Sequence, residues 1–329
     1  MSECKNCLTP IMGESVPCSR CGEVMHKDCA TVKCSCGEVL CDVCFLSHEK
    51  CKTCEEEAVV KLDTIRRSHI ELYARCPYAF ELEVVKGLGH AQTIYTQSGI
   101  DLHDMFDEYS KHDNGDALEM FEIFMEKYEQ HYPREWYNET YATREKMIER
   151  YKRNIDGFLA LRSTLPKPLI TEEKVFLNVG DNLPTVNITM DRIDEEDGEL
   201  VLGDYKTGKV MVGKKFTTDL QVPLYIKCVK SHYGKPVKRF DLYYTGEGKI
   251  RSFIRDESNH DLYSVTVNKR IYTVSLDATV KEVRTRLDKI TKGLFNIDPH
   301  QKQYDCRSCQ FFEKQCAGVD TETWKQARR

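Results

Sequence analysis

The chain has 329 residues, of which 40% are hydrophobic and 31% are charged. This composition is typical of a folded globular protein and excludes a disordered one, and the length allows one large core and a smaller appendage. The net charge of −5 argues against a protein that coats nucleic acid through bulk electrostatics, so any nucleic-acid track must be local.

Cysteine dominates the N-terminal segment, where eleven of the sixteen cysteines fall within the first 54 residues. A segment this short buries little apolar surface, so we expect tetrahedral Zn²⁺ sites to stabilise it. The number of ligands allows two or three zinc ions, and the spacing leaves open which ligands share an ion. The candidate zinc ligands are Cys4, Cys7, Cys18, Cys21, His26, Cys29, Cys34, Cys36, Cys41, Cys44, His48, Cys51 and Cys54.

The chain starts without an apolar leader, and none of its apolar runs approaches the roughly 20 residues that span a bilayer. We therefore expect no membrane association and a cytoplasmic location, in a bacterium or a phage-infected host, with a nucleus as the alternative. In such a reducing compartment, cysteines favour metal ligation over disulfides.

An acidic run at residues 55–57 separates the cysteine-rich segment from the rest of the chain. We expect a domain boundary here, with a zinc-binding module over residues 1–56 and a larger domain over residues 57–329. Apolar residues at helical spacing predict a helix from Ile65 to Val85, interrupted or restarted at Pro77. Further helices are predicted over residues 100–109 and between residues 118 and 161.

Strand patterns then replace the helical ones. Runs of β-branched and aromatic residues predict strands, with a turn at Asp197-Gly198. Two more helices are predicted over residues 217–232 and 278–295. The whole pattern indicates an α/β fold with a small mixed sheet flanked by helices. The predicted strands cover residues 174–179, 185–193, 199–206, 240–244 and 262–267.

Two of these strands carry a carboxylate pair and a lysine. Asp191 lies in the first, and the second ends in Asp204-Tyr205-Lys206. A hairpin through Asp197-Gly198 brings the two aspartates together, and strand alternation puts Asp204 and Lys206 on one face. Hydrolysis of a phosphodiester needs hard oxygen ligands for a divalent ion and an ammonium near the attacking water. The pattern therefore indicates a metal-dependent nuclease.

Nine cations and two acids occupy residues 203–240. We interpret this run as a candidate nucleic-acid track, and a solvated surface without special purpose is the alternative.

Further residues surround the carboxylate pair in the sequence. His103 follows Gly99 on a predicted helix, and Gln221 and Tyr225 lie four residues apart on a later one. Cys76 stands in Arg75-Cys76-Pro77-Tyr78, far from Cys306, Cys309 and Cys316 near the C-terminus. In order, type and spacing, residues 64–317 resemble the RecB-like branch of the PD-(D/E)XK nucleases. They are most similar to its iron-sulfur members, such as the AddB nuclease domain and the CRISPR-associated RecB-like exonucleases.

The resemblance implies a deoxyribonuclease that uses Mg²⁺ or Mn²⁺. Asp191, Asp204, the Tyr205 carbonyl and His103 match the ligands of the ion, and Lys206 matches the catalytic lysine. The residues corresponding to Gln221 and Tyr225 contact DNA and support the site in that family. The implied function is an exonuclease on single-stranded DNA or DNA ends, in repair, recombination or phage DNA processing.

The resemblance also implies a [4Fe-4S] cluster held by Cys76, Cys306, Cys309 and Cys316. The same four thiolates also suit Zn²⁺, and either centre would join the start of the domain to its end. The chain departs from the family pattern in two places. Thr189 and Met190 stand where a glycine often precedes the first aspartate, and six residues rather than five separate Cys309 from Cys316.

The run from Cys18 to Cys29 resembles the middle of RING and PHD-type fingers, which are mainly protein-binding modules. We therefore expect a protein partner at the zinc module. Val210 replaces the Ser or Thr of a phosphate-binding loop, so a helicase motor would have to be a separate partner. Two rival functions remain: a non-catalytic scaffold that binds DNA or protein, and a RING-type ubiquitin ligase.

Overall fold

The computed structural model describes residues 3–4, 6–11, 13–30, 39–41, 44, 60–112, 115–295, 306 and 309–311. The chain forms two compact units, Met1–Leu62 with Asp288–Phe295, and Asp63–Leu287 with Asn296–Arg329. We call the first unit the cysteine module and the second the main body. No helix in the described ranges is long and apolar enough to cross a membrane.

The cysteine module contains a short antiparallel hairpin of β1 (Ser15–Pro17) and β2 (Val24–His26), followed by the 3-10 turn η1 (Lys27–Cys29). Its buried residues are mainly cysteines. The buried cluster consists of Cys4, Cys18, Met25, Leu40, Cys41 and Cys44.

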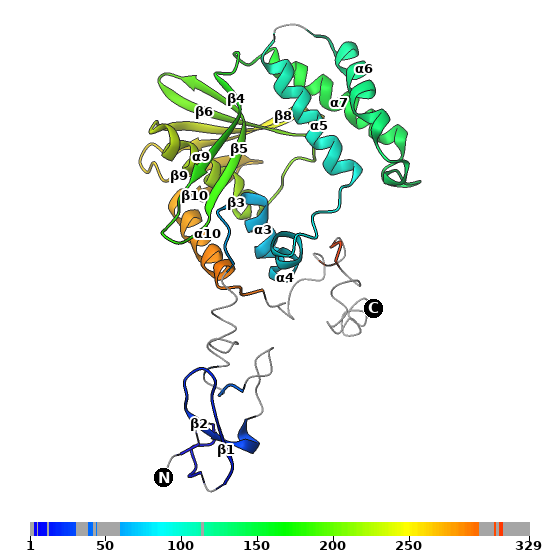
Figure 1. Cartoon of the computed structure of the whole chain (residues 1–329). Helices are drawn as coiled ribbons and strands as arrows, with labels where there is room; N and C mark the ends of the chain where they lie inside the picture. Colours follow the sequence, from blue (N-terminus) through cyan, green and yellow to red (C-terminus); the bar gives the residue numbers. More distant parts are fainter. Residues whose placement is uncertain are drawn as a thin grey trace. The chain divides into compact units, whose positions relative to one another are not determined.

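The main body is built on one mixed sheet of eight strands (Figure 1). The strands follow the order β10-β9-β8-β7-β6-β5-β3, and β4 pairs with the other edge of β5. Pairs β3–β5 and β6–β7 are parallel, and the remaining pairs are antiparallel. The strands are β3 (Thr64–Arg66), β4 (Ile170–Leu177), β5 (Thr185–Glu196), β6 (Glu199–Lys206), β7 (Val237–Tyr244), β8 (Lys249–Arg255), β9 (Leu262–Val267) and β10 (Arg270–Ser275).

The α/β class with a mixed sheet flanked by helices is confirmed, and the sheet has more strands than the five that the sequence predicts. Strands β8 and β10 extend the sheet beyond the predicted strands. Both are rich in exposed residues, such as Ile254 and Ile271, so they lack the buried alternation that identifies a strand in a sequence. The turn at Asp197-Gly198 is present, with φ of 56° and 82°, as a two-residue hairpin between twisted strands requires.

Helices cover both faces of this sheet. In Figure 1, α5, α6 and α7 lie together beside the strands, and α9 contacts β4, β5 and β7. The helices and helical turns are α3 (Arg67–Arg75), α4 (Pro77–Phe80), η2 (Glu81–Val85), α5 (Ile94–Ser110), α6 (Ala117–Lys127), η3 (Glu129–His131), η4 (Arg134–Trp136), α7 (Arg144–Arg162), α8 (Lys215–Thr218), α9 (Gln221–Tyr233), η5 (Thr245–Glu247) and α10 (Leu276–Thr291).

Three predicted helices differ in their limits. Ile65 lies in β3 rather than in a helix, and Pro77 starts a new helix, α4, whose N-cap is Cys76. Helix α5 begins six residues earlier than predicted because Thr93 and Thr96 form a reciprocal capping box. The predicted helix over residues 217–232 divides into α8 and α9.

An aromatic core joins α5 and α7 to the sheet. Phe106 and Phe158 stack with ring centroids 4.3 Å apart, and both rings contact Tyr205 of β6. Gly157 of α7 allows a close approach to η5, since a Cβ atom there would lie 1.8 Å from the Thr245 carbonyl oxygen. This packing fixes α5 and α7 over the strand that carries Asp204 and Lys206.

Candidate active site

The candidate site lies where one edge of β5 changes partners. Strand β3 pairs with residues 185–187 of β5 and β6 pairs with residues 192–196, while β4 occupies the opposite edge. Among the described residues, no strand pairs with residues 188–191 on this edge. The β5–β6 pairing ends at Arg192 and Gly203, so Asp191 and Asp204 are the next residues on each strand.

Asp191 is held at this gap by two donors. Its Oδ2 accepts a 2.7 Å hydrogen bond from the Tyr205 backbone N–H and lies 3.2 Å from Nδ1 of His103. His103 comes from α5, so the helix and both strands meet at one carboxylate. Burial lowers the pKa of His103, but the Asp191 carboxylate outweighs burial, and the pKa rises to about 9.

Asp204, Lys206 and Gln221 form a second connected group. The Lys206 ammonium lies 2.8 Å from Oδ2 of Asp204 and donates to Oε1 of Gln221 at 2.5 Å. The Gln221 amide in turn donates to Oδ1 of Asp204. Gln221 is the first residue of α9, which explains how this helix fixes the carboxylate and the ammonium together.

Glu172 also lies at the site, although it is not among the residues predicted from the sequence. Its carboxylate lies within 4.8 Å of the ligand atoms of His103 and Asp191. Thr171 pairs with Arg192 and Glu173 with Met190, which places Glu172 opposite Asp191. Glu172 has a φ of 49°, which residues of a regular strand rarely adopt, so strand patterns do not predict it. The only signal in the sequence was an acidic residue just before the first predicted strand, residues 174–179.

The residues of this site fit a divalent cation. The ligand atoms of His103, Glu172 and Asp191 all lie within 4.8 Å of one another, and Asp204 follows the last residue of β6 that pairs with β5, beside Asp191. Oδ2 of Asp204 is buried, and its partner among the described residues is the Lys206 ammonium at 2.8 Å. Oxygen and imidazole donors suit Mg²⁺ or Mn²⁺.

The carboxylates differ in their affinity for protons. Burial raises the pKa of Asp204, even with the Lys206 ammonium beside it. Burial also opposes ionisation of Asp191, but the charge of His103 prevails and lowers the Asp191 pKa. Burial and the Asp191 charge raise the pKa of Glu172 to about 7.

Tyr225 lies one turn beyond Gln221 and supports the site from behind. Its ring centroid is 5.9 Å from the guanidinium of Arg67, which forms a 2.7 Å ion pair with Glu71. The Tyr205 side chain points into the aromatic core, so only its backbone faces the gap between the strands.

The C-terminal cysteines are described in part. The Cys76 sulfur accepts a hydrogen bond from the Ala79 N–H at 3.4 Å. Burial and the nearby Cys309 thiol raise the Cys76 pKa. Gln310 ties this turn to the loop after η2 by donating to the Gly89 carbonyl at 2.6 Å. Among the described residues, Cys76, Cys306 and Cys309 do not belong to a group with all ligand atoms within 4.8 Å. Cys316 lies outside the described residues.

The cysteine module brings eight predicted ligands into two groups. One contains Cys4, Cys7, His26 and Cys29, and the other contains Cys18, Cys21, Cys41 and Cys44. The two sets alternate along the chain, as in a cross-braced finger. Two ligands bound to one tetrahedral zinc at 2.3 Å lie about 3.8 Å apart. The sulfurs of Cys21 and Cys41 are 3.9 Å apart, which matches this spacing.

Backbone donors prepare the first cysteine of each group for metal. Burial raises the Cys4 pKa, but the N–H groups of Cys7 and His26 outweigh burial, and the pKa falls to about 6. The Cys18 pKa falls to about 6 in the same way, through Cys21 and Cys41. Thiolates are the form that binds zinc. Five predicted ligands lie outside the described residues: Cys34, Cys36, His48, Cys51 and Cys54.

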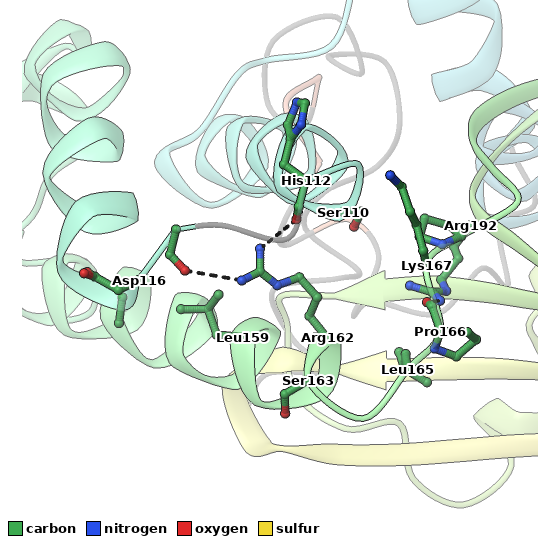
Figure 2. A pocket seen from close by; sticks show the side chains of 13 residues that line it. Ser110, His112, Asp116, Leu159, Arg162, Ser163, Leu165, Pro166, Lys167 and Arg192 are labelled. Atoms are coloured by element: carbon green, nitrogen blue, oxygen red, sulfur yellow. Dashed lines mark hydrogen bonds between the residues drawn. The ribbon is translucent and has the colours of Figure 1, made fainter.

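A cavity of about 460 Å³ between α5, α7 and the start of β4 is distinct from the site (Figure 2). Figure 2 shows the Arg162 guanidinium directed at the carbonyl groups of His112 and Gly115, at 3.4 and 3.3 Å. Arg192 is paired with Asp194 at 2.6 Å. Both arginines that line this cavity therefore make contacts within the protein.

Part of the basic run of residues 203–240 is paired with acidic residues. Lys235 pairs with Glu195, Lys238 with Glu196, and Lys227 with Asp277. These pairs reduce the positive charge of the run, and its interpretation as a nucleic-acid track stays a prediction.

Comparison with known proteins adds family evidence to this geometry. The sequence profile of the PD-(D/E)XK nuclease superfamily matches residues 67–316. No curated protein matches the chain. The "Putative exonuclease" from Eubacterium rectale aligns at 12% identity and a TM-score of 0.40, covering 74% of this chain and 86% of that one. The structure named SSO0001 aligns at 15% identity and a TM-score of 0.27, covering 65% and 93%.

Proposed function

The chain belongs to the PD-(D/E)XK nuclease superfamily, whose members hydrolyse phosphodiesters, and we propose that it is an Mg²⁺- or Mn²⁺-dependent deoxyribonuclease of the RecB-like branch. We further propose that it acts as an exonuclease on single-stranded DNA or DNA ends inside the cell, in repair, recombination or phage DNA processing. The proposed division of labour gives DNA cutting to residues 57–329 and partner docking to residues 1–56.

One observation carries the proposal. Asp191 and Asp204 stand at the point where β5 and β6 separate, and the Lys206 ammonium lies 2.8 Å from Asp204. An ordinary surface ion pair between two strand residues would not include a second buried carboxylate, a histidine from a helix, and a glutamine that hydrogen-bonds to both members of the pair.

In the proposed reaction, Asp191, Asp204, His103 and the Tyr205 carbonyl hold the ion, and Glu172 adds a carboxylate. A bound Mg²⁺ or Mn²⁺ supplies Lewis-acid stabilisation of the phosphate and a water of lowered pKa. Lys206 positions the attacking water and offsets negative charge on the phosphate. Gln221 holds the side chains of Lys206 and Asp204 in position through hydrogen bonds. Tyr225 supports helix α9 through its contact with Arg67.

The test is cleavage of end-labelled single-stranded DNA, duplex DNA and RNA with Mn²⁺, comparing wild type with Lys206→Ala. Lys167→Ala, in the separate cavity of Figure 2, is the matched control. We expect wild type and control to cut DNA and Lys206→Ala to be inactive. Equal cutting by all three proteins would overturn the mechanism, and cutting of RNA alone would overturn the substrate.

We also propose that Cys76, Cys306, Cys309 and Cys316 hold a [4Fe-4S] cluster. A four-iron cluster is wider than one ion, so its sulfurs stand further apart than those around a zinc. Cys309 lies close enough to Cys76 for its charge to raise the Cys76 pKa, which supports a shared centre. Iron and sulfide analysis with a visible spectrum tests the proposal, and a colourless protein that contains only zinc would contradict it.

For the cysteine module we propose two zinc ions in the alternating groups, and a third ion on the remaining ligands is the alternative. We propose that the module binds a protein partner, such as a separate helicase. The interleaved ligand order supports this proposal because cross-braced fingers are mainly binding platforms. A ubiquitin-transfer assay tests the ligase alternative, and a cleavage-dead protein that still supports the pathway would favour the scaffold alternative.

A further inference from the structure

A second cavity, of about 920 Å³, begins directly after the catalytic strand. It lies between α5, α7, η5 and the loop that follows Lys206. Thr207 lines it, so the residue next to the catalytic lysine already belongs to its wall. Its lining includes the cations Lys146, Arg150, Arg153 and Lys209, the carboxylates Glu149 and Glu247, and the aromatic residues Tyr95 and Tyr141.

Helix α5 connects this cavity to the metal ligands. Thr96 lines the cavity and His103 contacts Asp191, and these two residues are seven positions apart, on the same face of the helix. The rise between them is about 10 Å. Gly99 lies between them, and a Cβ atom at this position would lie 3.5 Å from Thr207 Oγ1. Because glycine has no side chain, Gly99 places nothing in the path from the cavity to the site.

Two exposed aromatic rings line the cavity on a fixed backbone. Tyr141 is 82% exposed and Tyr95 is 46% exposed. The Tyr95 hydroxyl donates to the Tyr141 carbonyl at 2.9 Å, and Asn138 accepts the Tyr141 N–H at 2.7 Å. The Arg150 guanidinium lies 5.7 Å from the Tyr95 ring centroid, over one face of that ring. The more exposed Tyr141 ring is available for stacking, and the face of an unpaired base is a suitable partner.

The cations beside these rings include some without acidic partners. Arg150 donates to Ser98 and Thr207 and has no ion pair among the residues that the structure describes. Lys209 and Arg153 are exposed, and their side chains form no hydrogen bond or ion pair with other described residues. Glu247, by contrast, is paired with Lys249 at 2.8 Å. The cavity therefore presents positive charge and aromatic faces together.

We propose that this cavity holds a single strand of DNA next to the scissile phosphate, with bases stacked on Tyr141 and Tyr95 and phosphates on Lys209, Arg153 and Arg150. This inference rests on the proposed nuclease function and deepens it. A duplex keeps its bases stacked internally and offers no free base face to Tyr141. The cavity therefore selects single strands or frayed ends.

The test measures binding of a fluorescein-labelled thymidine oligonucleotide by anisotropy. All variants are made in a Lys206→Ala background, so that the probe stays intact. Tyr141→Ala is expected to weaken binding at least about fivefold, the lower limit for loss of one base stack, while Tyr141→Phe binds as the parent does. Lys209→Glu is expected to lower the salt dependence of binding by about one phosphate contact. Lys167→Glu is the matched charge reversal in the other cavity.

The outcomes separate the two proposals. If wild-type protein cuts no nucleic acid but Tyr141→Ala and Lys209→Glu still weaken binding, the nuclease function fails and the strand site stands. If wild type cuts DNA while both variants bind as tightly as Lys167→Glu does, the strand site is overturned. Blunt duplex bound as tightly as the single strand would also overturn it.

Discussion

The two compact units of this chain bury different kinds of residue. The main body has an aromatic core in which Phe106 stacks on Phe158, and the proposed catalytic residues lie beside that core. In the cysteine module, the most buried residues are the predicted metal ligands themselves, such as Cys4, Cys18 and Cys41. We therefore expect the main body to fold without its proposed ion and the module to need the proposed zinc ions in order to fold.

The largest expected effect is the loss of the module's fold when zinc is removed. Structural zinc contributes on the order of 10 kcal/mol or more to folding of such small domains, and little apolar surface remains to replace it. We expect Cys18→Ser or a zinc chelator to make the module sensitive to protease. Cys228→Ala, a buried cysteine of α9 outside the metal groups, should leave zinc content unchanged. A protease-resistant module without zinc would remove the contrast between the units.

In the main body, by contrast, removing a metal ligand should abolish activity and leave the fold intact. We expect Asp204→Asn to reduce DNA cutting by about 10³-fold, since both ion binding and charge stabilisation are lost. The melting temperature of the metal-free protein should stay the same or rise, because a buried charge is removed. A melting temperature lowered as far as that of a core variant would mean that Asp204 is structural.

The aromatic core gives the complementary test. Phe106→Ala should destabilise the main body by about 3–5 kcal/mol through the cavity it leaves. Zinc content of the module should not change. Denaturant unfolding measures the effect, with Ile271→Ala as the control, since Ile271 is 70% exposed. A loss of zinc with Phe106→Ala would show that the two units do not fold independently.

Gln221 should have an intermediate effect because it acts through its neighbours. We expect Gln221→Ala to reduce activity about 10- to 100-fold, as is usual for a residue that orients a metal ligand. Gln221→Glu changes the charge but keeps the shape, and it should disturb Asp204 more than Lys206, because the amide that donates to Asp204 becomes a carboxylate oxygen while the oxygen that accepts from Lys206 is kept. A pH–rate profile separates these cases: a shift of its limbs indicates a positioning role, and an unchanged profile with a lower rate argues against one.

The smallest expected effect concerns pH. The folded-state pKa of Glu172 is about 7, above its ordinary value, so the folded protein holds a proton that the unfolded chain has lost. Stability of the metal-free protein should therefore fall as pH rises from about 4.5 through 7. Glu172→Gln should make this fall shallower in melting experiments. An identical slope for both proteins would place the Glu172 carboxylate in solvent.

The same contrast explains what the sequence could and could not reveal. Asp204 and Lys206 share a predicted strand, and alternation alone puts them on one face. The pairing of Cys4 with His26 depends on how the chain folds back, and spacing does not determine it. Glu172 escaped detection because its position opposite Asp191 depends on the register between β4 and β5, which no local pattern encodes. Exposed strands such as β8 carry too few buried positions to be recognised.

The shortness of β3 has a consequence for how this protein tolerates change. Because this strand has only three residues, no strand in the described part of the chain pairs with residues 188–191 of β5 on that edge. If β3 were a few residues longer and kept its register, main-chain hydrogen bonds would fill the gap beside residues 188–191. The carboxylates that are proposed to act on a phosphate would then be covered. The reaction centre thus depends on a strand that stops early, and insertions here should be harmful even where they stabilise the sheet.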